Sequence, residues 1–191
     1  MFNKFIKINI SFALLWLVGC GSNSVRVADE IQNHKQLVQG AFARDYDMEV
    51  VIDSENRLMW QDTNDTLHIK KPFVTPENYL AKNLSDTQGD TATTYCQNLV
   101  LGGFNNWRLP KKEELETLVD VNEYPNIDKH FKYKDATIGG DYWSSTKNYE
   151  GCSYPKNHIW VTDFLIEHNG NIMGGCTTDN NKHRIRCVRD Y

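Results

Sequence analysis

The first twenty residues, MFNKFIKINISFALLWLVGC, constrain this chain more than any other feature of the sequence. Lys4 and Lys7 form a short positive region, and the apolar run from Ile8 to Val18 is too short to span a bilayer comfortably. This pattern is typical of an export signal. It removes residues 1–19 from any folded core and places the remainder outside the cytoplasm, where disulfide bonds form.

The end of this segment, Leu17-Val18-Gly19-Cys20, has the pattern of a bacterial lipobox. In a lipobox the cysteine is acylated and becomes the new N-terminus, whereas in a plain signal peptide Cys20 would be a chance residue. Gly21 and Ser22 follow in place of an aspartate, which in enterobacterial-type sorting indicates the outer membrane. We therefore expect a lipid anchor on Cys20 in the cell envelope, and the sequence leaves open the periplasmic or the surface face.

Four cysteines remain after Cys20, and an even number outside the cytoplasm indicates disulfide bonds. A zinc site is the alternative, but the sequence contains no CxxC and no clustered Cys/His spacing. Four cysteines allow three pairings, and the residues alone do not choose among them. We expect disulfides to involve Cys96, Cys152, Cys176 and Cys187.

Loss of the signal makes the chain more acidic. Removing Lys4 and Lys7 takes the formal net charge from −4 to −6. Nucleic-acid binding without sequence preference requires a basic face, so we expect no nucleic-acid partner. A hydrophobic content of 40% is sufficient for one folded core.

The remainder divides into a tether and one domain. Residues 20–45 are polar and mixed, and we expect a tether between membrane and domain. The domain covers residues 46–191 and begins with an expected hairpin over 48–61. The stretch 62–90 is rich in Asp, Asn, Thr and Pro and is expected to be mostly loop.

After residue 90, helix signals come before strand signals. Asp90 is expected to cap a helix over 91–101 that Gly102-Gly103 ends, and Pro110 starts a second helix. Several short strands follow. They are expected at 141–146, at 158–164, at 172–173 after a turn over 168–171, and at 184–189. Two helices followed by antiparallel strands predict an α+β domain.

Seven ordered motifs carry a resemblance to a known family. They are RLMWQ (57–61), YCQNL (95–99), GGFNNWRLP (102–110), EL (114–115), YWSS (142–145), WVTDF (160–164) and RCVR (186–189). Together they resemble the Lcl C-terminal domain, the C-terminal domain of collagen-like bacterial adhesins, over residues 46–191. The chain departs from the family pattern at Asn56-Arg57, where Thr-Gly is usual, and in the long loop at 62–90.

The resemblance implies a C-type-lectin-like or formylglycine-generating-enzyme-like fold, with two helices packed on short antiparallel strands. It also implies that the first cysteine pairs with the last and that the two middle ones pair together. The expected bonds are Cys96–Cys187 and Cys152–Cys176. The first would join a helix to the closing strand across a long loop.

The expected function is non-catalytic ligand binding, with a glycan or an envelope partner protein as ligand. An accessory subunit of a surface or pilus assembly is one alternative. An enzyme of the formylglycine-generating type is another, but it requires a redox pair of cysteines. A catalytic triad of nucleophile, base and acid could be combined from Ser144-Ser145, His158 and Asp163. However, no nucleophile elbow of the GxSxG type surrounds the serines. We therefore expect no catalytic residue.

Two loops, 147–158 and 174–184, are the expected functional surface. The family's adhesins are associated with sulfated glycosaminoglycans, and basic residues near the second loop could dock sulfate groups. A solvated surface explains the same residues equally well. The candidate ligand-binding residues are Lys156, His158, Asp179, Asn181, Lys182 and Arg184.

No metal or cofactor is expected. Calcium would find oxygen ligands in Asp62-Thr63-Asn64-Asp65 and Asp179-Asn180-Asn181, but neither stretch has an EF-hand loop. The sugar-binding motifs of C-type lectins are also missing from the sequence. Trp107 is expected in the core and Arg108 beside an internal acid, which makes Trp107-Arg108-Leu109-Pro110 a structural corner.

Overall fold

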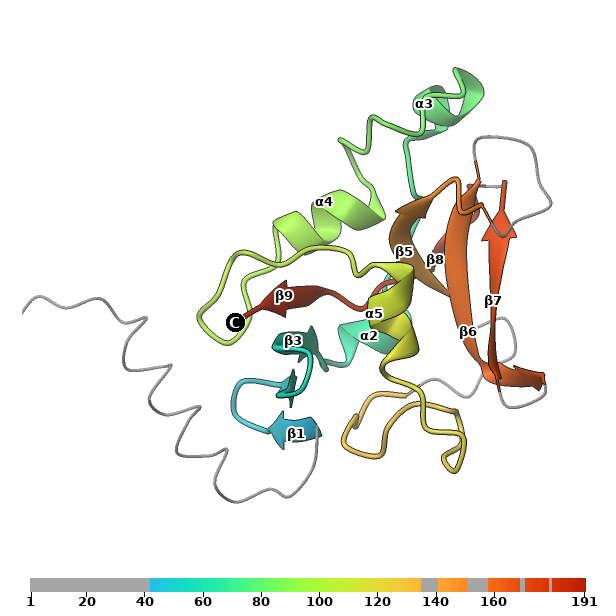
Figure 1. Cartoon of the computed structure of the whole chain (residues 1–191). Coiled ribbons are helices and arrows are strands. Elements are labelled where there is room, and N and C mark those ends of the chain that lie inside the picture. The colour runs from blue at the N-terminus through green and yellow to red at the C-terminus, as the bar shows by residue number, and fades with distance from the viewer. Residues whose placement is uncertain (1–41, 135–140, 151–157, 169–170, 179) are drawn as a thin grey trace, which may run out of the picture. The chain divides into compact units, whose positions relative to one another are not determined.

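Two β-sheets and four short helices make up the part of the chain that the structure describes (Figure 1). The structure is a computed structural model that describes residues 42–134, 141–150, 158–168, 171–178 and 180–191. These residues lie within one compact unit, Gly40–Tyr191. The predicted α+β class is confirmed, although the described helices number four instead of two.

The first sheet unites the start of the domain with its last strand. Its strand order is β1-β2-β3-β9, and all neighbours are antiparallel. The hairpin predicted over 48–61 is confirmed as β2 and β3, and the Asp53 carboxylate accepts the Glu55 and Asn56 N–H groups in the turn. The strands are β1 (Phe42–Asp45), β2 (Val50–Asp53), β3 (Leu58–Gln61) and β9 (Val188–Asp190).

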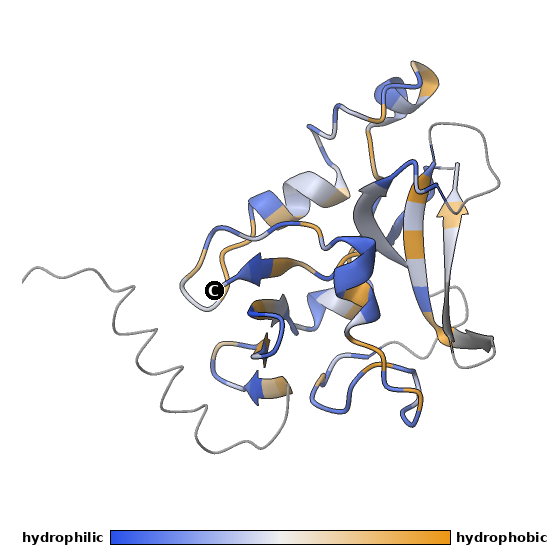
Figure 2. Ribbon diagram, viewed as in Figure 1, coloured by the Kyte–Doolittle hydropathy of each residue, from blue (hydrophilic) through white to orange (hydrophobic). Residues whose placement is uncertain are grey.

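The second sheet has the order β4-β8-β5-β6-β7, in which β5 and β8 are parallel and the other neighbours antiparallel. The strands are β4 (Lys70–Lys71), β5 (Tyr142–Lys147), β6 (Ile159–His168), β7 (Asn171–Thr177) and β8 (His183–Arg184). Figure 2 shows hydrophobic and paler residues alternating along the start of β6. Thr162 and Asp163 are at most 5% exposed, so the polar positions of this strand are buried as well as the apolar ones.

The chain passes from one sheet to the other between β8 and β9. A single closing strand over 184–189 was predicted, and this prediction is wrong. Ile185, Arg186 and Cys187 are all at most 1% exposed, whereas a strand with one solvated face would alternate. These residues form a buried crossing, and the chain pairs with β5 before it and with β3 after it.

The helices are short. They are α2 (Asp65–His68), α3 (Pro76–Leu80), α4 (Ala92–Gln97) and α5 (Lys112–Glu116), so the stretch predicted as mostly loop contains α2, β4 and α3. The helix predicted over 91–101 stops at Gln97, and its N-cap is Thr91 instead of Asp90. Val100 lies beyond the helix and is 73% exposed.

A buried ion pair occupies the space beside the main hydrophobic core. Asp62 and Arg186 are both fully buried, and the Asp62 carboxylate bonds Arg186 and Arg44. The same carboxylate accepts the backbone N–H groups of Lys132 and Tyr133 at 2.8 and 3.1 Å. Asp62 therefore holds the loop before residue 135 against the crossing between the sheets.

Candidate functional site

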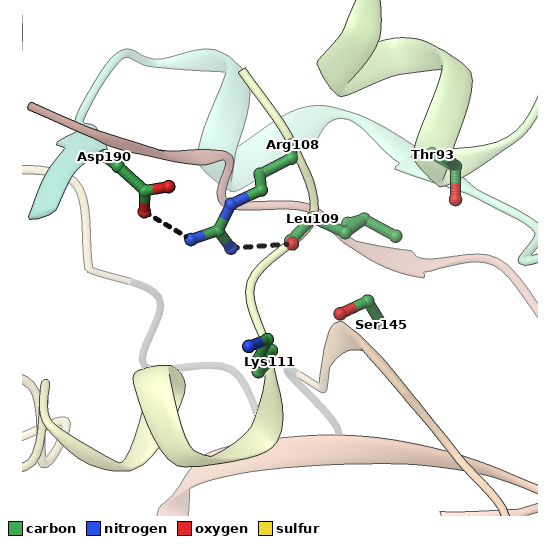
Figure 3. A pocket seen from close by; sticks show the side chains of 6 residues that line it. All are labelled: Thr93, Arg108, Leu109, Lys111, Ser145 and Asp190. Carbon is green, nitrogen blue, oxygen red and sulfur yellow. Dashed lines mark hydrogen bonds and ion pairs between the residues drawn. The ribbon is translucent and has the colours of Figure 1, made fainter. Parts of the chain in front are cut away.

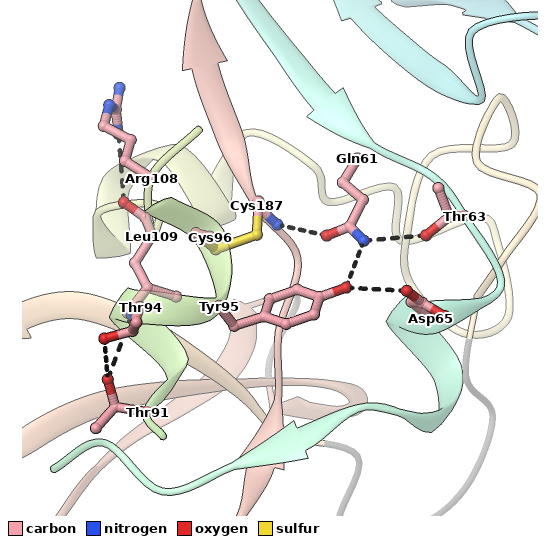
Figure 4. The surroundings of a disulfide bond; sticks show 10 residues. All are labelled: Gln61, Thr63, Asp65, Thr91, Thr94, Tyr95, Cys96, Arg108, Leu109 and Cys187. Carbon is pink, nitrogen blue, oxygen red and sulfur yellow. Dashed lines mark hydrogen bonds between the residues drawn. A yellow bond between two sulfur atoms is a disulfide. The ribbon is translucent and has the colours of Figure 1, made fainter. Parts of the chain in front are cut away.

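A disulfide bond fixes α4 against the crossing between the two sheets (Figure 4). Cys96, which lies on α4, is bonded to Cys187, and both residues are fully buried. The predicted Cys96–Cys187 pairing is confirmed. Cys176 is also disulfide-bonded, whereas Cys152 lies outside the described residues.

A chain of hydrogen bonds leads from this disulfide to Tyr95. The Gln61 side chain accepts the Cys187 N–H at 3.2 Å and donates to the Tyr95 hydroxyl at 3.0 Å (Figure 4). The Tyr95 hydroxyl in turn donates to Asp65 at 3.2 Å. Burial raises the pKa of the Tyr95 phenol to about 12. Tyr95 is thus a neutral, oriented hydrogen-bonding group at physiological pH.

A cavity of about 510 Å³ opens beside Tyr95. We call it the Tyr95 cleft. Its wall combines one aromatic ring with carboxylate, ammonium, hydroxyl and amide groups, and these come from Asp65, Lys71, Asp90, Thr94, Tyr95 and Asn98. Such a mixture suits a ligand that offers many hydrogen bonds together with some apolar surface.

The groups in the Tyr95 cleft differ in how far the protein already satisfies them. Lys71 pairs with Asp90 at 2.5 Å, and the Thr94 hydroxyl bonds the Thr91 hydroxyl and the Thr87 carbonyl. The side-chain amide of Asn98 has no hydrogen-bond partner among the residues that the structure describes. Asn98 therefore offers a donor and an acceptor to a ligand.

Arg108 anchors the corner Trp107-Arg108-Leu109-Pro110 (Figure 3). Its guanidinium bonds both carboxylate oxygens of Glu114 at 2.7 Å and one of Asp190 at 2.7 Å. These acids raise the pKa of Arg108 further above its ordinary value. The prediction that Arg108 pairs with an internal acid is confirmed.

The corner joins the two sheets. The backbone of Arg108 exchanges two hydrogen bonds of 2.9 Å with Val188 of β9, and the Pro110 carbonyl accepts the Ser145 N–H from β5. Trp107 is 2% exposed and donates its indole N–H to the Phe104 carbonyl, so its predicted core position is confirmed.

A second cavity of about 320 Å³ lies beside this corner, and we call it the Arg108 pocket. Thr93, which lies on α4, faces the corner and β5 across this pocket (Figure 3). The remaining lining residues are Arg108, Leu109, Lys111, Ser145 and Asp190.

The predicted ligand-binding residues are not all on the surface. His158 and Arg184 are 4% and 5% exposed, so their side chains contribute little to an accessible surface. Asn181 and Lys182 are exposed, and Lys156 and Asp179 lie outside the described residues.

The arginines near the end of the chain do not form an exposed patch. Arg184, Arg186 and Arg189 are each at most 8% exposed, and Arg189 packs over the Phe104 ring. Since a sulfate group must reach a guanidinium to bind it, these arginines do not supply the sulfate-docking surface that their sequence spacing had suggested.

Ser144, His158 and Asp163 do not form a catalytic triad in the described part of the chain. Ser144 is buried and donates to the Trp160 carbonyl, while His158 Nε2 contacts the Tyr149 carbonyl at 3.2 Å. The Asp163 carboxylate accepts the Leu165 N–H. Each of these groups therefore has a local structural partner.

The two stretches proposed for calcium are largely committed to protein contacts. Asp62 belongs to the buried ion pair, and Asn180 bonds the backbone of Phe73 and Val74. No group of three or more His, Cys, Asp or Glu side chains suited to a metal occurs in the described parts of the chain. Within those parts no helix is long and apolar enough to cross a membrane.

Neither cavity was predicted from the sequence, although Asp65, Arg108 and Ser145, which line them, are named there for other reasons. Tyr95 belongs to the YCQNL motif and is expected from the sequence only as part of a helix. Thr93 and Thr94 lie on that helix and Asn98 is its C-cap, and the three side chains form a polar side opposite the buried Cys96. This polar face was the signal that could have located the site.

Comparison with known proteins gives one match. A family model described as the Lcl C-terminal domain matches residues 49–189 of the chain. Neither the curated proteins nor the solved structures contain a significant match to the chain.

Proposed function

The chain belongs to the Lcl C-terminal domain family, and from this premise we propose that it is a non-catalytic envelope lipoprotein that binds a glycan in the Tyr95 cleft. The observation that carries the proposal is the cleft itself. It places one partly buried aromatic ring among hydroxyl, carboxylate and amide groups.

An uncharged glycan suits this cleft better than a sulfated one. The lining contains two carboxylates, Asp65 and Asp90, and one ammonium group, Lys71, so its formal net charge is negative. Lys71 is already paired with Asp90. A sulfated chain would meet carboxylates here and would not reach the buried arginines. Sugar hydroxyls can both donate to Asp65 and accept from Asn98.

We also propose that the domain has the C-type-lectin-like or formylglycine-generating-enzyme-like arrangement. The bond from Cys96 on α4 to Cys187 near the last strand supports this proposal, because the resemblance implied it. The thiols required for formylglycine-type chemistry are not free at Cys96, Cys176 or Cys187, which favours binding without catalysis.

A glycan array printed with neutral and sulfated oligosaccharides tests the binding proposal. Asn98→Ala removes a polar group from the cleft, and we expect two- to tenfold weaker binding of neutral glycans, the range for one net hydrogen bond. Asn105→Ala, at an exposed asparagine outside the cleft, is the matched control. An array that stays blank for neutral glycans at low salt would overturn the proposal.

Attachment to the envelope through Cys20 belongs to the same proposal. Replacement of Cys20 by serine should abolish labelling by a radioactive fatty acid and leave the N-terminal segment uncleaved, which a mass difference from wild type would show. Protease treatment of intact cells then decides which face of the membrane the domain occupies. Unchanged labelling of Cys20→Ser would contradict the lipid anchor.

An accessory role in a surface or pilus assembly is the second candidate function. It is favoured by α3, which has no buried residue and ends in Leu80 with 81% exposure. Figure 1 shows α3 at the periphery of the fold. If a partner protein covers α3, gentle crosslinking should recover it in stoichiometric amount from wild type and not from Leu80→Ser.

A further inference from the structure

The two cavities lie on two sides of the same helix. Thr93 lines the Arg108 pocket, whereas Thr94 and Asn98 line the Tyr95 cleft. We propose that the cavities are two subsites of one site, and that the ligand is an oligosaccharide chain that crosses α4. This inference rests on the proposed function, because it takes the Tyr95 cleft as the first glycan subsite.

The helix between the subsites is a low, polar ridge. Thr93 and Gln97 are four residues apart on α4, and Thr94 lies four residues before the C-cap Asn98, so the four side chains form two adjacent rows. None of the four is fully buried. Threonine side chains are short, and a chain of sugars can pass over them without meeting a bulky apolar group.

The size of the ridge determines the length of the ligand. An α-helix is roughly 10 Å across with its side chains, and six residues extend roughly 9 Å along the axis. A single sugar can fill one cavity but cannot reach both across this width. The arrangement therefore selects an oligosaccharide over a monosaccharide.

Several groups along this path are available to a ligand. The Thr93 hydroxyl, the Gln97 amide and the Lys111 ammonium have no hydrogen-bond or ion-pair partner among the described residues. A polyhydroxylated chain can satisfy each of them, since sugar hydroxyls both donate and accept hydrogen bonds.

The walls of the site are held in place before any ligand arrives. The Cys96–Cys187 bond fixes the buried side of α4 to the crossing between the sheets. Glu114 and Asp190 fix the Arg108 guanidinium at the edge of the pocket. A preformed site loses little conformational freedom on binding. Occupying a second linked subsite then adds affinity, because the second contact is intramolecular.

The test is binding as a function of oligomer length. Linear glucose, mannose and N-acetylglucosamine series, from the monosaccharide to the hexasaccharide, are measured against the full chain. We expect affinity to rise with length until both subsites are filled and then to level off. Equal affinity at every length would overturn the two-subsite proposal and leave single-site glycan binding standing.

A pocket variant locates the second subsite. Thr93→Val with Lys111→Met removes two polar groups from the Arg108 pocket, and the longer oligomers should bind about fivefold more weakly or worse. Monosaccharide binding in the Tyr95 cleft should not change, which also reports that the variant is folded. Lys129→Met, at an exposed lysine of another loop, is the control and should bind all lengths like wild type.

The outcomes separate the two proposals. Absence of binding at every length in wild type would overturn the proposed glycan function itself. Equal weakening of short and long oligomers by the double variant would place Thr93 and Lys111 outside a second subsite and overturn only the inference made here.

Discussion

Arg57 holds a backbone conformation that favours glycine. Its φ is +55°, in the left-handed region, and its side chain is exposed at the end of the turn between β2 and β3. This is one of the two positions where the chain departs from the family's usual Thr-Gly. The departure therefore places a non-glycine residue where the turn needs a positive φ.

Arg57→Gly should stabilise the domain by about 0.5–1 kcal/mol, since relief of left-handed strain exceeds the entropy that glycine adds to the unfolded chain. Urea unfolding measures the difference. Glu55→Gly, in the same turn but without a positive φ, should destabilise. If both variants lose stability equally, strain at Arg57 is not significant.

The titration of the Tyr95 phenol predicts that the domain loses stability at alkaline pH. Its phenol has a folded-state pKa of about 12 against an ordinary value of 10.0. Above the ordinary value the unfolded state loses this proton first, so the stability contributed by burying the neutral phenol is complete below pH 10 and is lost as pH rises through 12.

Tyr95→Phe removes this titration and should flatten the fall in the free energy of unfolding over that pH range. Chemical denaturation at a series of alkaline pH values is the measurement. Tyr124→Phe, at a tyrosine that is 73% exposed, serves as the control and should keep the wild-type profile. A Tyr95→Phe profile that is no flatter than wild type would contradict the assignment.

At the scale of elements, the packing of β6 against β7 depends on Gly174. Trp160 of β6 lies against Gly174 of β7, and a Cβ added at Gly174 would come within 2.1 Å of the indole ring. Trp160 also contacts the Lys112 ammonium at 4.8 Å and the Tyr149 ring at 5.2 Å. A methyl group at Gly174 would therefore push the indole out of these contacts.

Gly174→Ala should destabilise the domain by about 1–3 kcal/mol, the usual cost of overpacking. Gly175→Ala is a matched control in the next position, because a Cβ there meets nothing within 4 Å. The two unfolding curves, measured side by side, should differ. Similar stability of both variants would show that Trp160 adapts to the added methyl group.

Elements with local signals could be predicted from sequence, and elements defined by distant partners could not. The β2–β3 hairpin has its turn residues and alternation within one short stretch, and it appears where predicted. The break between β8 and β9 depends on β5 and β3, which lie far away in sequence. No local pattern in RIRCVR distinguishes one continuous strand from a crossing between sheets.

The whole domain is closed by the Cys96–Cys187 bond, which links residues 91 positions apart. In the chain-entropy model such a closure contributes about 4–5 kcal/mol. Cys96→Ser with Cys187→Ser should therefore cost about 2–5 kcal/mol, the range seen when native disulfides are removed. Thermal and urea unfolding of the variant against oxidised wild type provide the measurement, and equal stabilities would contradict it.

The candidate site was harder to predict than the fold. The expected loops, 147–158 and 174–184, follow the composition of the sequence, but the described cavities lie on either side of α4. Each cavity combines a helix residue with residues from remote segments, such as Asp65 in the Tyr95 cleft and Ser145 in the Arg108 pocket. Only the folded chain brings these segments together.

The pairing of β9 with β3 has a consequence for the order in which the protein matures. The first sheet lacks its fourth strand until residues 188–190 have been synthesised, and the corner at Arg108 lacks its backbone partner until Val188 is present. A ribosome-bound or half-translocated chain therefore cannot complete this sheet.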